Sequence, residues 1–218
     1  MDKTRLDFLE TRWYGRFIYE TDFTFLPQLQ EISIRKDTWI TGYWQSPLYF
    51  QDHADTMRSE LMPPPSKEAR FIDIAKDIRS SESVALGVRL YEESSDPNAH
   101  ARDGKIKSAS QIREALRSLR TKRPKARIFV FCTHRSPVLD ELDLPTDSVF
   151  ATHDDGLEGT IDRLWLLTQC QHHIFTNSSY YWWGAWLSAA LRGQEGQTVI
   201  AADNFYHQQG LCATWQTF

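Results

Sequence analysis

The sequence predicts an α/β protein with a Rossmann-like parallel sheet and helices on both of its faces. From about residue 83 onward, short apolar and β-branched runs alternate with amphipathic helical stretches. Strands that alternate with helices at this spacing imply parallel pairing and right-handed crossovers. Near the end of the chain, the short strand 174–176 runs into small polar residues and then into a helix that ends near Gly193. Sheets of this class place their ligand sites at such turns.

The N-terminal region, residues 1–65, is expected to be an incomplete and mainly helical part of a larger domain. In its second half, Ser46 and Pro47 predict the cap and first position of a helix that continues to Leu61. The run 63–65 is three prolines, which break regular structure and favour stiff polyproline geometry. We therefore place a domain boundary there, with residues 66–218 forming the Rossmann-like domain.

In the Rossmann-like domain, Ser66 is expected to cap a helix that carries an apolar stripe to Ile78. The strand 84–90 shows period-two alternation. Further strands are predicted at 128–131, 148–151, 174–176 and 198–201, with helices near 112–119, after Ser136-Pro137 and over 164–171. The polar segment 94–107 predicts an exposed loop. His172 and His173 are expected at the junction of a helix and a strand, without a metal.

Composition excludes several classes of protein. The net charge of −4 argues against a nucleic-acid-binding surface. No apolar run approaches the roughly 20 residues that span a bilayer, and the first residues are unlike a signal peptide. A cytoplasmic protein without a membrane span is expected, and the three distant cysteines fit buried thiols. The dinucleotide fingerprint G-x-G-x-x-G is absent, so a dinucleotide site is not expected.

Asn177, Ser178 and Ser179 stand between the strand 174–176 and the following helix. The free amides of a helix start, the serine hydroxyls and the helix dipole all favour an anion at this point. The alternative is that the serines only cap the helix. The turn by itself leaves both readings open.

Three blocks, in the same order along the chain, resemble the α-1,2-fucosyltransferase family. Residues 170–187 (CQHHIFTNSSYYWWGAWL) are similar to its hallmark block C-K-H-x-I-x-x-N-S-[ST]-F-S-W-W-G-A-W-L. Residues 42–50 (GYWQSPLYF) are similar to G-Y-F-Q-S-x-x-Y-F, and residues 199–206 to V-I-A-P-x-x-W-F. The resemblance covers the chain from about residue 10 to residue 206.

The resemblance implies a GT-B enzyme with two facing Rossmann-like domains, of which the carboxyl-terminal one holds GDP-fucose. It implies transfer to a galactose-type 2-hydroxyl with inversion, without a metal or other cofactor. The family's donor motif H-x-R-R-x-D falls on residues 87–92, so Arg89 is expected to grip the β-phosphate and to act in catalysis. The expected donor-binding residues are Arg89, Glu92, His134, Asn177, Ser178 and Ser179. Tyr43 and Gln45 are expected to line the acceptor cleft, and Trp182 and Trp186 to be buried.

The chain also departs from the family pattern. Gly87 replaces the motif histidine, Leu90 the second arginine and Glu92 the acid; Thr133-His134 replace an acidic pair, and Arg163 replaces an aspartate. The phosphate half of the site thus looks retained and the guanine half altered. The G-G-L-G-N-Q loop that opens the family is missing, so the chain is a fragment, is degenerate, or takes its missing N-terminal domain from a partner. The alternatives to a fucosyltransferase are a non-catalytic relative that binds a glycan or a partner protein, and a transferase for a different nucleotide sugar.

Overall fold

The computed structural model describes residues 16–20, 24–30, 38–91, 106–193, 196–204 and 208–218. The chain forms two compact units, Met1–Asp52 with Tyr206–Cys212, and His53–Phe205 with Ala213–Phe218. These units do not divide at the prolines 63–65, because α2 (Ala54–Leu61) belongs to the second unit. The Arg58 Nε of α2 donates to the Trp186 carbonyl at 3.3 Å, and the Arg58 guanidinium lies 4.4 Å over the Trp186 ring. Residue Glu92 and most of the predicted loop 94–107 lie outside the described residues.

The first unit contains a two-stranded parallel sheet, β1 (Arg16–Tyr19) and β2 (Thr38–Thr41). The sequence did not predict these two strands, which are rich in β-branched and aromatic side chains. In the described part of residues 1–65, helical segments still hold more residues than strands, because α2 and three 3₁₀ turns lie there. Ser46 does cap a turn, with its Oγ accepting from the Leu48 amide at 3.3 Å. That turn is a short 3₁₀ segment, Pro47–Tyr49, and the regular helix begins only at Ala54.

The second unit is built on six parallel strands in the order β5-β4-β3-β6-β7-β8. Their bounds are β3 Ser83–Gly87, β4 Arg127–Phe131, β5 Val149–Ala151, β6 His172–Phe175, β7 Val199–Ala201 and β8 Gln216–Thr217. The α/β class with a parallel sheet is confirmed. The chain adds β4 and β5 on one side of β3, then returns to place β6 on the other side. The strand order therefore reverses between β3 and β6.

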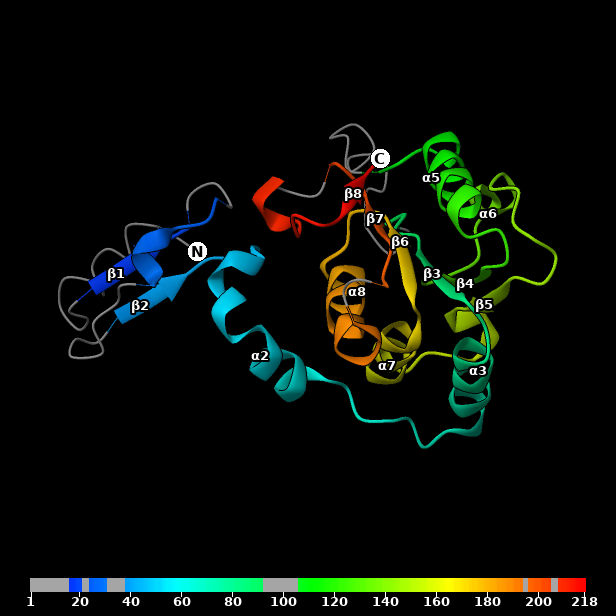
Figure 1. Cartoon of the computed structure of the whole chain (residues 1–218), viewed down its shortest axis with the longest axis horizontal. Coiled ribbons are helices and arrows are strands. Elements are labelled where there is room, and N and C mark those ends of the chain that lie inside the picture. Colours follow the sequence, from blue (N-terminus) through cyan, green and yellow to red (C-terminus); the bar gives the residue numbers. More distant parts are fainter. Residues whose placement is uncertain (1–15, 21–23, 31–37, 92–105, 194–195, 205–207) are drawn as a thin grey trace. The chain divides into compact units, whose positions relative to one another are not determined.

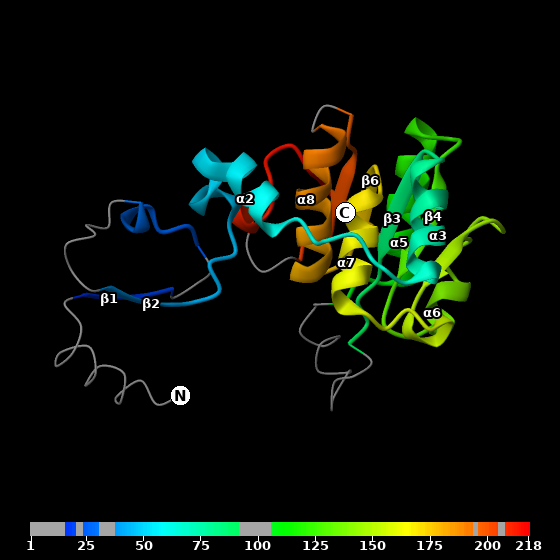
Figure 2. The same ribbon diagram turned by 90° about the horizontal axis from the view of Figure 1, so that it is seen from below.

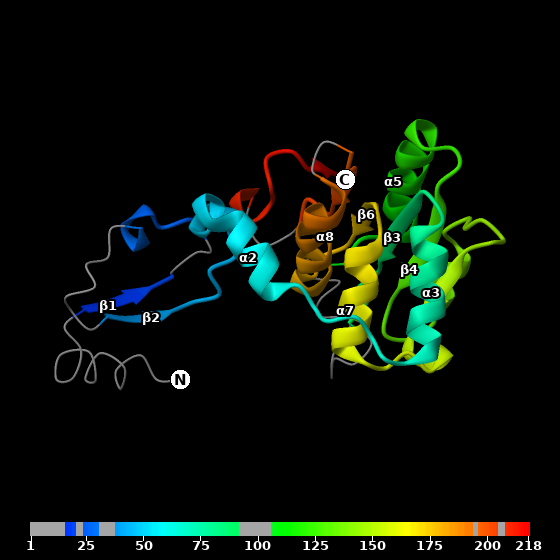
Figure 3. The same cartoon turned by 60° about the horizontal axis from the view of Figure 1, so that its bottom comes forward.

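Helices cover both faces of this sheet, as predicted (Figure 1). On one face lie α3 (Ala69–Arg79), α7 (Thr160–Gln169) and α8 (Ser179–Arg192), with α7 packed between the other two (Figures 2 and 3). On the other face lie α5 (Ala109–Lys122) and α6 (Pro137–Asp140). Leu86, Val130 and Ile174 of the sheet pack with Ile112 and Leu119 of α5 in the main apolar core.

The structure differs from the sequence predictions in β3 and at the start of β6. All five residues of β3 are buried, so the predicted period-two pattern is wrong and the strand ends at Gly87. His172 and His173 lie within β6 instead of before it, because that strand pairs with β3 from Val84 onward. His173 Nε2 lies 2.9 Å from Ser188 Oγ, and His172 Nδ1 accepts from the Thr198 amide at 3.0 Å, whereas His172 Nε2 is buried without a hydrogen-bond partner among the described residues.

Candidate functional site

The reversal of strand order places a candidate site at the carboxyl ends of β3 and β6. The two strands stay joined beyond the last sheet pairing, because the Arg89 amide donates to Thr176 Oγ1 at 2.7 Å and the Thr176 amide donates to the Gly87 carbonyl at 3.0 Å. Arg89 and the turn 177–179 are therefore brought to adjacent strand ends. Open α/β sheets bind ligands at such a reversal.

Tyr91 holds the Arg89 side chain beside this turn. The Arg89 guanidinium carbon lies 4.6 Å from the centre of the Tyr91 ring, and the Tyr91 hydroxyl donates to the Asn177 carbonyl at 3.3 Å. Tyr91 has a φ of 59°, in the left-handed region that a bulky residue rarely adopts. Such strain persists only where surrounding contacts enforce it, and it concentrates at functional sites.

The start of α8 is not capped by a serine side chain. Ser178 occupies the N-cap position with an extended backbone, but its hydroxyl makes no capping hydrogen bond. The first backbone bond of the helix is from the Trp182 amide to the Ser178 carbonyl at 3.0 Å, so the amides of residues 179–181 have no partner within the helix. Ser179 is exposed, and Asn177 is buried with its Oδ1 lacking a hydrogen-bond partner within the described residues. The free backbone amides and the positive end of the helix dipole therefore favour an anion at the start of α8.

His134 lies one strand pair away, at the ends of β4 and β5. Its Nδ1 is 2.8 Å from Asp154 Oδ1, and the Arg135 amide donates to Asp154 Oδ2 at 2.7 Å. The hydrogen bond from His134, followed by that from the Arg135 amide, lowers the pKa of Asp154. The Arg135 Nη2 pairs with Asp155 Oδ1 at 2.7 Å. These residues form an exposed ionic cluster on the same edge of the sheet.

The remaining predicted residues lie in the first unit. Tyr43 is exposed, and its amide donates to Glu20 Oε2 at 2.5 Å. The Gln45 Oε1 is buried without a hydrogen-bond partner among the residues described. Both lie on the segment between β2 and the 3₁₀ turn Pro47–Tyr49.

Sequence reasoning missed the role of Tyr181 in this site. Its hydroxyl donates to the Phe131 carbonyl at 2.9 Å and lies 3.3 Å from the Val88 carbonyl, which bridges the ends of β4 and β3. A Cβ on Gly87 would lie 2.5 Å from the Tyr181 ring. The ring therefore fills the space that a side chain at position 87 would need. The available signal was a tyrosine where the hallmark block has serine, coupled to a glycine where the donor motif has histidine.

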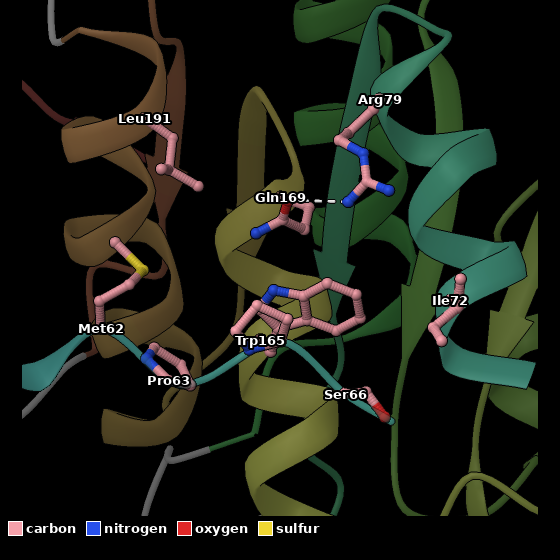
Figure 4. Close-up of a pocket in the computed structure, with 9 residues that line it drawn as sticks. Met62, Pro63, Ser66, Ile72, Arg79, Trp165, Gln169 and Leu191 are labelled. Atoms are coloured by element: carbon pink, nitrogen blue, oxygen red, sulfur yellow. Dashed lines mark hydrogen bonds between the residues drawn. The ribbon is translucent and has the colours of Figure 1, made fainter. Parts of the chain in front are cut away.

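A separate pocket of about 500 Å³ lies between the segment 62–66 and the helices α3, α7 and α8 (Figure 4). It is lined mainly by apolar side chains together with Trp165, and the Arg79 Nη1 donates to Gln169 Oε1 at 3.2 Å across it. Arg79 and Gln169 end α3 and α7, the helices that lead into β3 and β6. Their end of the pocket is thus at the amino edge of the sheet, away from the candidate site.

Within the described ranges, no group of three or more His, Cys, Asp or Glu side chains is arranged to hold a metal ion. No described helix combines the length and apolar character that a membrane crossing requires. The candidate site accordingly consists of a guanidinium, a tyrosine, small polar residues and a helix start.

A helix start at the strand reversal of a parallel α/β sheet is typical of domains that bind phosphate-bearing ligands. The sequence profile of Glycosyl transferase family 11 matches residues 19–214, and the chain belongs to this family. The resemblance stated from the three sequence blocks is thereby confirmed at the level of the family.

Several known proteins are similar to parts of the chain. An α-1,2-colitosyltransferase of Escherichia coli is 28% identical over 150 residues, which cover 67% of this chain and 50% of that protein. The chain therefore spans half the length of this curated relative. The NodZ α-1,6-fucosyltransferase, co-crystallised with GDP, is 19% identical with a TM-score of 0.47, over 82% of this chain and 58% of that one. The β-Kdo 2,4 transferase KpsC of Thermosulfurimonas dismutans is 13% identical with a TM-score of 0.37, over 72% and 51%.

Proposed function

We propose that the chain carries the donor-binding part of a fucosyltransferase-like glycosyltransferase. The reaction is transfer of fucose from GDP-fucose to a galactose-type 2-hydroxyl, with inversion and without a metal or cofactor. Membership of Glycosyl transferase family 11 supports this proposal, as does the α-1,2 linkage in the name of the Escherichia coli relative. The chain spans half the length of that relative.

One observation carries the proposal. The Arg89 guanidinium lies over the Tyr91 ring, and the Tyr91 hydroxyl donates a hydrogen bond to the Asn177 carbonyl, next to the start of α8, which has no side-chain cap. In an inverting transfer, the acceptor hydroxyl attacks the anomeric carbon while the bond from that carbon to the diphosphate oxygen breaks. Negative charge then grows on the leaving diphosphate, and fixed donors around it stabilise the transition state. A guanidinium fork and the positive end of a helix supply such donors.

The residues take distinct parts in this proposal. Arg89 holds the β-phosphate and stabilises its charge, while Ser178, Ser179 and the first amides of α8 hold the diphosphate. Asn177 shapes the turn, and its buried Oδ1 accepts a hydrogen bond from the donor substrate. His134 and Glu92 contribute to the base side of the donor, and Tyr43 and Gln45 to the acceptor side.

The test is calorimetric titration of the chain with GDP-fucose. We expect binding, and a loss of affinity of at least about tenfold in Arg89→Ala, because an arginine–phosphate hydrogen bond is charge-assisted. Arg120→Ala is the matched control, since Arg120 is an exposed arginine on α5. Absence of binding at millimolar GDP-fucose, or equal affinities in wild type and Arg89→Ala, would refute the proposal.

The Gly87–Tyr181 contact favours a second candidate, a transferase that uses another nucleotide sugar. The tyrosine ring occupies the position of the motif histidine, so the base side of the site has a different shape. A panel of GDP-, UDP- and TDP-sugars, with a colitose donor included, separates the candidates by affinity. Product formation with lactose as the acceptor excludes the non-catalytic alternative.

A further inference from the structure

Arg163 is a buried guanidinium that the proposed site has not yet used. Its side chain is 6% exposed, and its Nη2 donates to the Cys132 carbonyl at 2.6 Å, just beyond the end of β4. The Arg163 Nε is buried without a hydrogen-bond partner among the described residues, and none of the ion pairs found between described side chains includes Arg163. A buried cation without an anion is unfavourable and requires a compensating partner.

The fold places this guanidinium at the carboxyl edge of the sheet. Helix α7 leads back into β6, so its first turn, which contains Arg163, lies at the edge where β3 and β4 end. The start of α8 is joined to it, because the Tyr180 hydroxyl donates to the Thr160 carbonyl at 2.6 Å. Arg163 and the uncapped start of α8 are therefore neighbours. A cation in the first turn of a helix opposes the helix dipole, which makes the position unfavourable in the absence of an anion.

Tyr181 connects Arg163 with Arg89. Its hydroxyl is bonded to the Phe131 carbonyl, and Arg163 is bonded to the carbonyl of the next residue, Cys132. Burial raises the pKa of Tyr181, while the positive charges of Arg163 and Arg89 oppose that rise. Both guanidiniums thus lie within electrostatic range of one hydroxyl group.

We propose that Arg163 is a second diphosphate-binding arginine of the donor site, an inference that rests on the proposed function. The end of β3 offers Arg89 followed by Leu90, and hence one guanidinium. A departing diphosphate gains charge, and Arg163 supplies a second fixed cation from α7. The orphaned Nε is the donor that a phosphate oxygen satisfies. The aspartate expected at position 163 would instead repel that oxygen.

The experiment is calorimetry of the full chain with inorganic pyrophosphate, GDP and guanosine. Arg163→Gln retains a donor for the Cys132 carbonyl and removes the charge. We expect it to weaken pyrophosphate and GDP binding by at least about tenfold while leaving guanosine binding unchanged. Arg120→Gln, on the exposed face of α5, is the control and should bind all three as the wild type does.

The outcomes separate this inference from the proposed function. Wild-type pyrophosphate affinity in Arg163→Gln, together with a loss in Arg89→Ala, would overturn the role of Arg163 and leave the proposed function standing. A wild type that binds neither pyrophosphate nor GDP would overturn both. Arg163→Lys, which keeps the charge and loses the fork, should bind pyrophosphate with intermediate affinity. If neither variant folds, Arg163 is structural and the inference is wrong.

Discussion

The buried His173 should make the stability of the second unit depend on pH. Its imidazole lies within β6 and contacts Ser188 of α8, so it joins the strand and the helix that flank the candidate site. Burial, as the largest cause, lowers the pKa of His173 from its ordinary value of 6.5 to about 3. At a pH between these two pKa values, His173 is therefore protonated in the unfolded chain and neutral in the folded chain.

The direction and size of the effect follow from this difference. Stability falls as the pH drops below 6.5, because protonation favours the unfolded chain. Between pH 7 and pH 5, this single group is expected to remove about 2 kcal/mol of the free energy of unfolding. Urea unfolding at pH 7, 6 and 5 measures the change.

His173→Gln isolates the contribution, because glutamine keeps a polar terminus near Ser188 and does not titrate. The variant should lose about 2 kcal/mol less than the wild type over the same pH range. His53→Gln, at an exposed position, should behave as the wild type does. Equal pH dependence in His173→Gln and the wild type would refute the reasoning, as would an NMR titration of His173 with a pKa near 6.5.

Two further predictions concern the candidate site. Gly87→Ala should destabilise the protein by about 1–3 kcal/mol, because the new Cβ overlaps the buried Tyr181 ring. In a Tyr181→Ser background, the same substitution should lose most of this cost. Thermal unfolding of the wild type, the two single variants and the double variant measures the difference. Ser178→Ala should change the free energy of unfolding by less than about 0.5 kcal/mol, because its hydroxyl makes no capping bond, whereas Ser108→Ala, in the capping box of α5, should cost about 1 kcal/mol. A large loss in Ser178→Ala would show that this serine is structural; a loss of GDP-fucose affinity at unchanged stability is the expected result.

The order of strands and helices in the second unit could be predicted because each apolar run is bounded by caps or breakers. The strand β8 could not, since Gln216 and Thr217 are exposed and pair only at the sheet edge. The strands β1 and β2 were not predicted, because the first 40 residues are rich in aromatic side chains without a regular period. In β3, burial on both faces removed the alternation on which the predicted bounds depended.

The proximity of Arg89 to the turn 177–179 was predictable from topology, since parallel strands end at a common edge. The partners that shape the site were not. The Tyr181 ring packs against Gly87, which lies 94 residues earlier in the sequence. Arg163, on the helix that follows β5, donates a hydrogen bond to the Cys132 carbonyl. These contacts depend on how α7 and α8 pack on the sheet, which no local pattern specifies.

The departures at positions 87 and 181 are best understood as one change. A glycine at position 87 makes room for the Tyr181 ring, and the Tyr181 hydroxyl then lies 3.3 Å from the carbonyl of Val88, the residue before Arg89. The Tyr181 ring, which fills the space beside position 87, is therefore also bonded to the strand end that presents Arg89. The shape of the site beside position 87 and the position of the Arg89 backbone thus depend on the same side chain. Substitution of Tyr181 alone should disturb both the space beside position 87 and the Arg89 backbone. Simultaneous substitution of Gly87 and Tyr181 should preserve the backbone that carries Arg89.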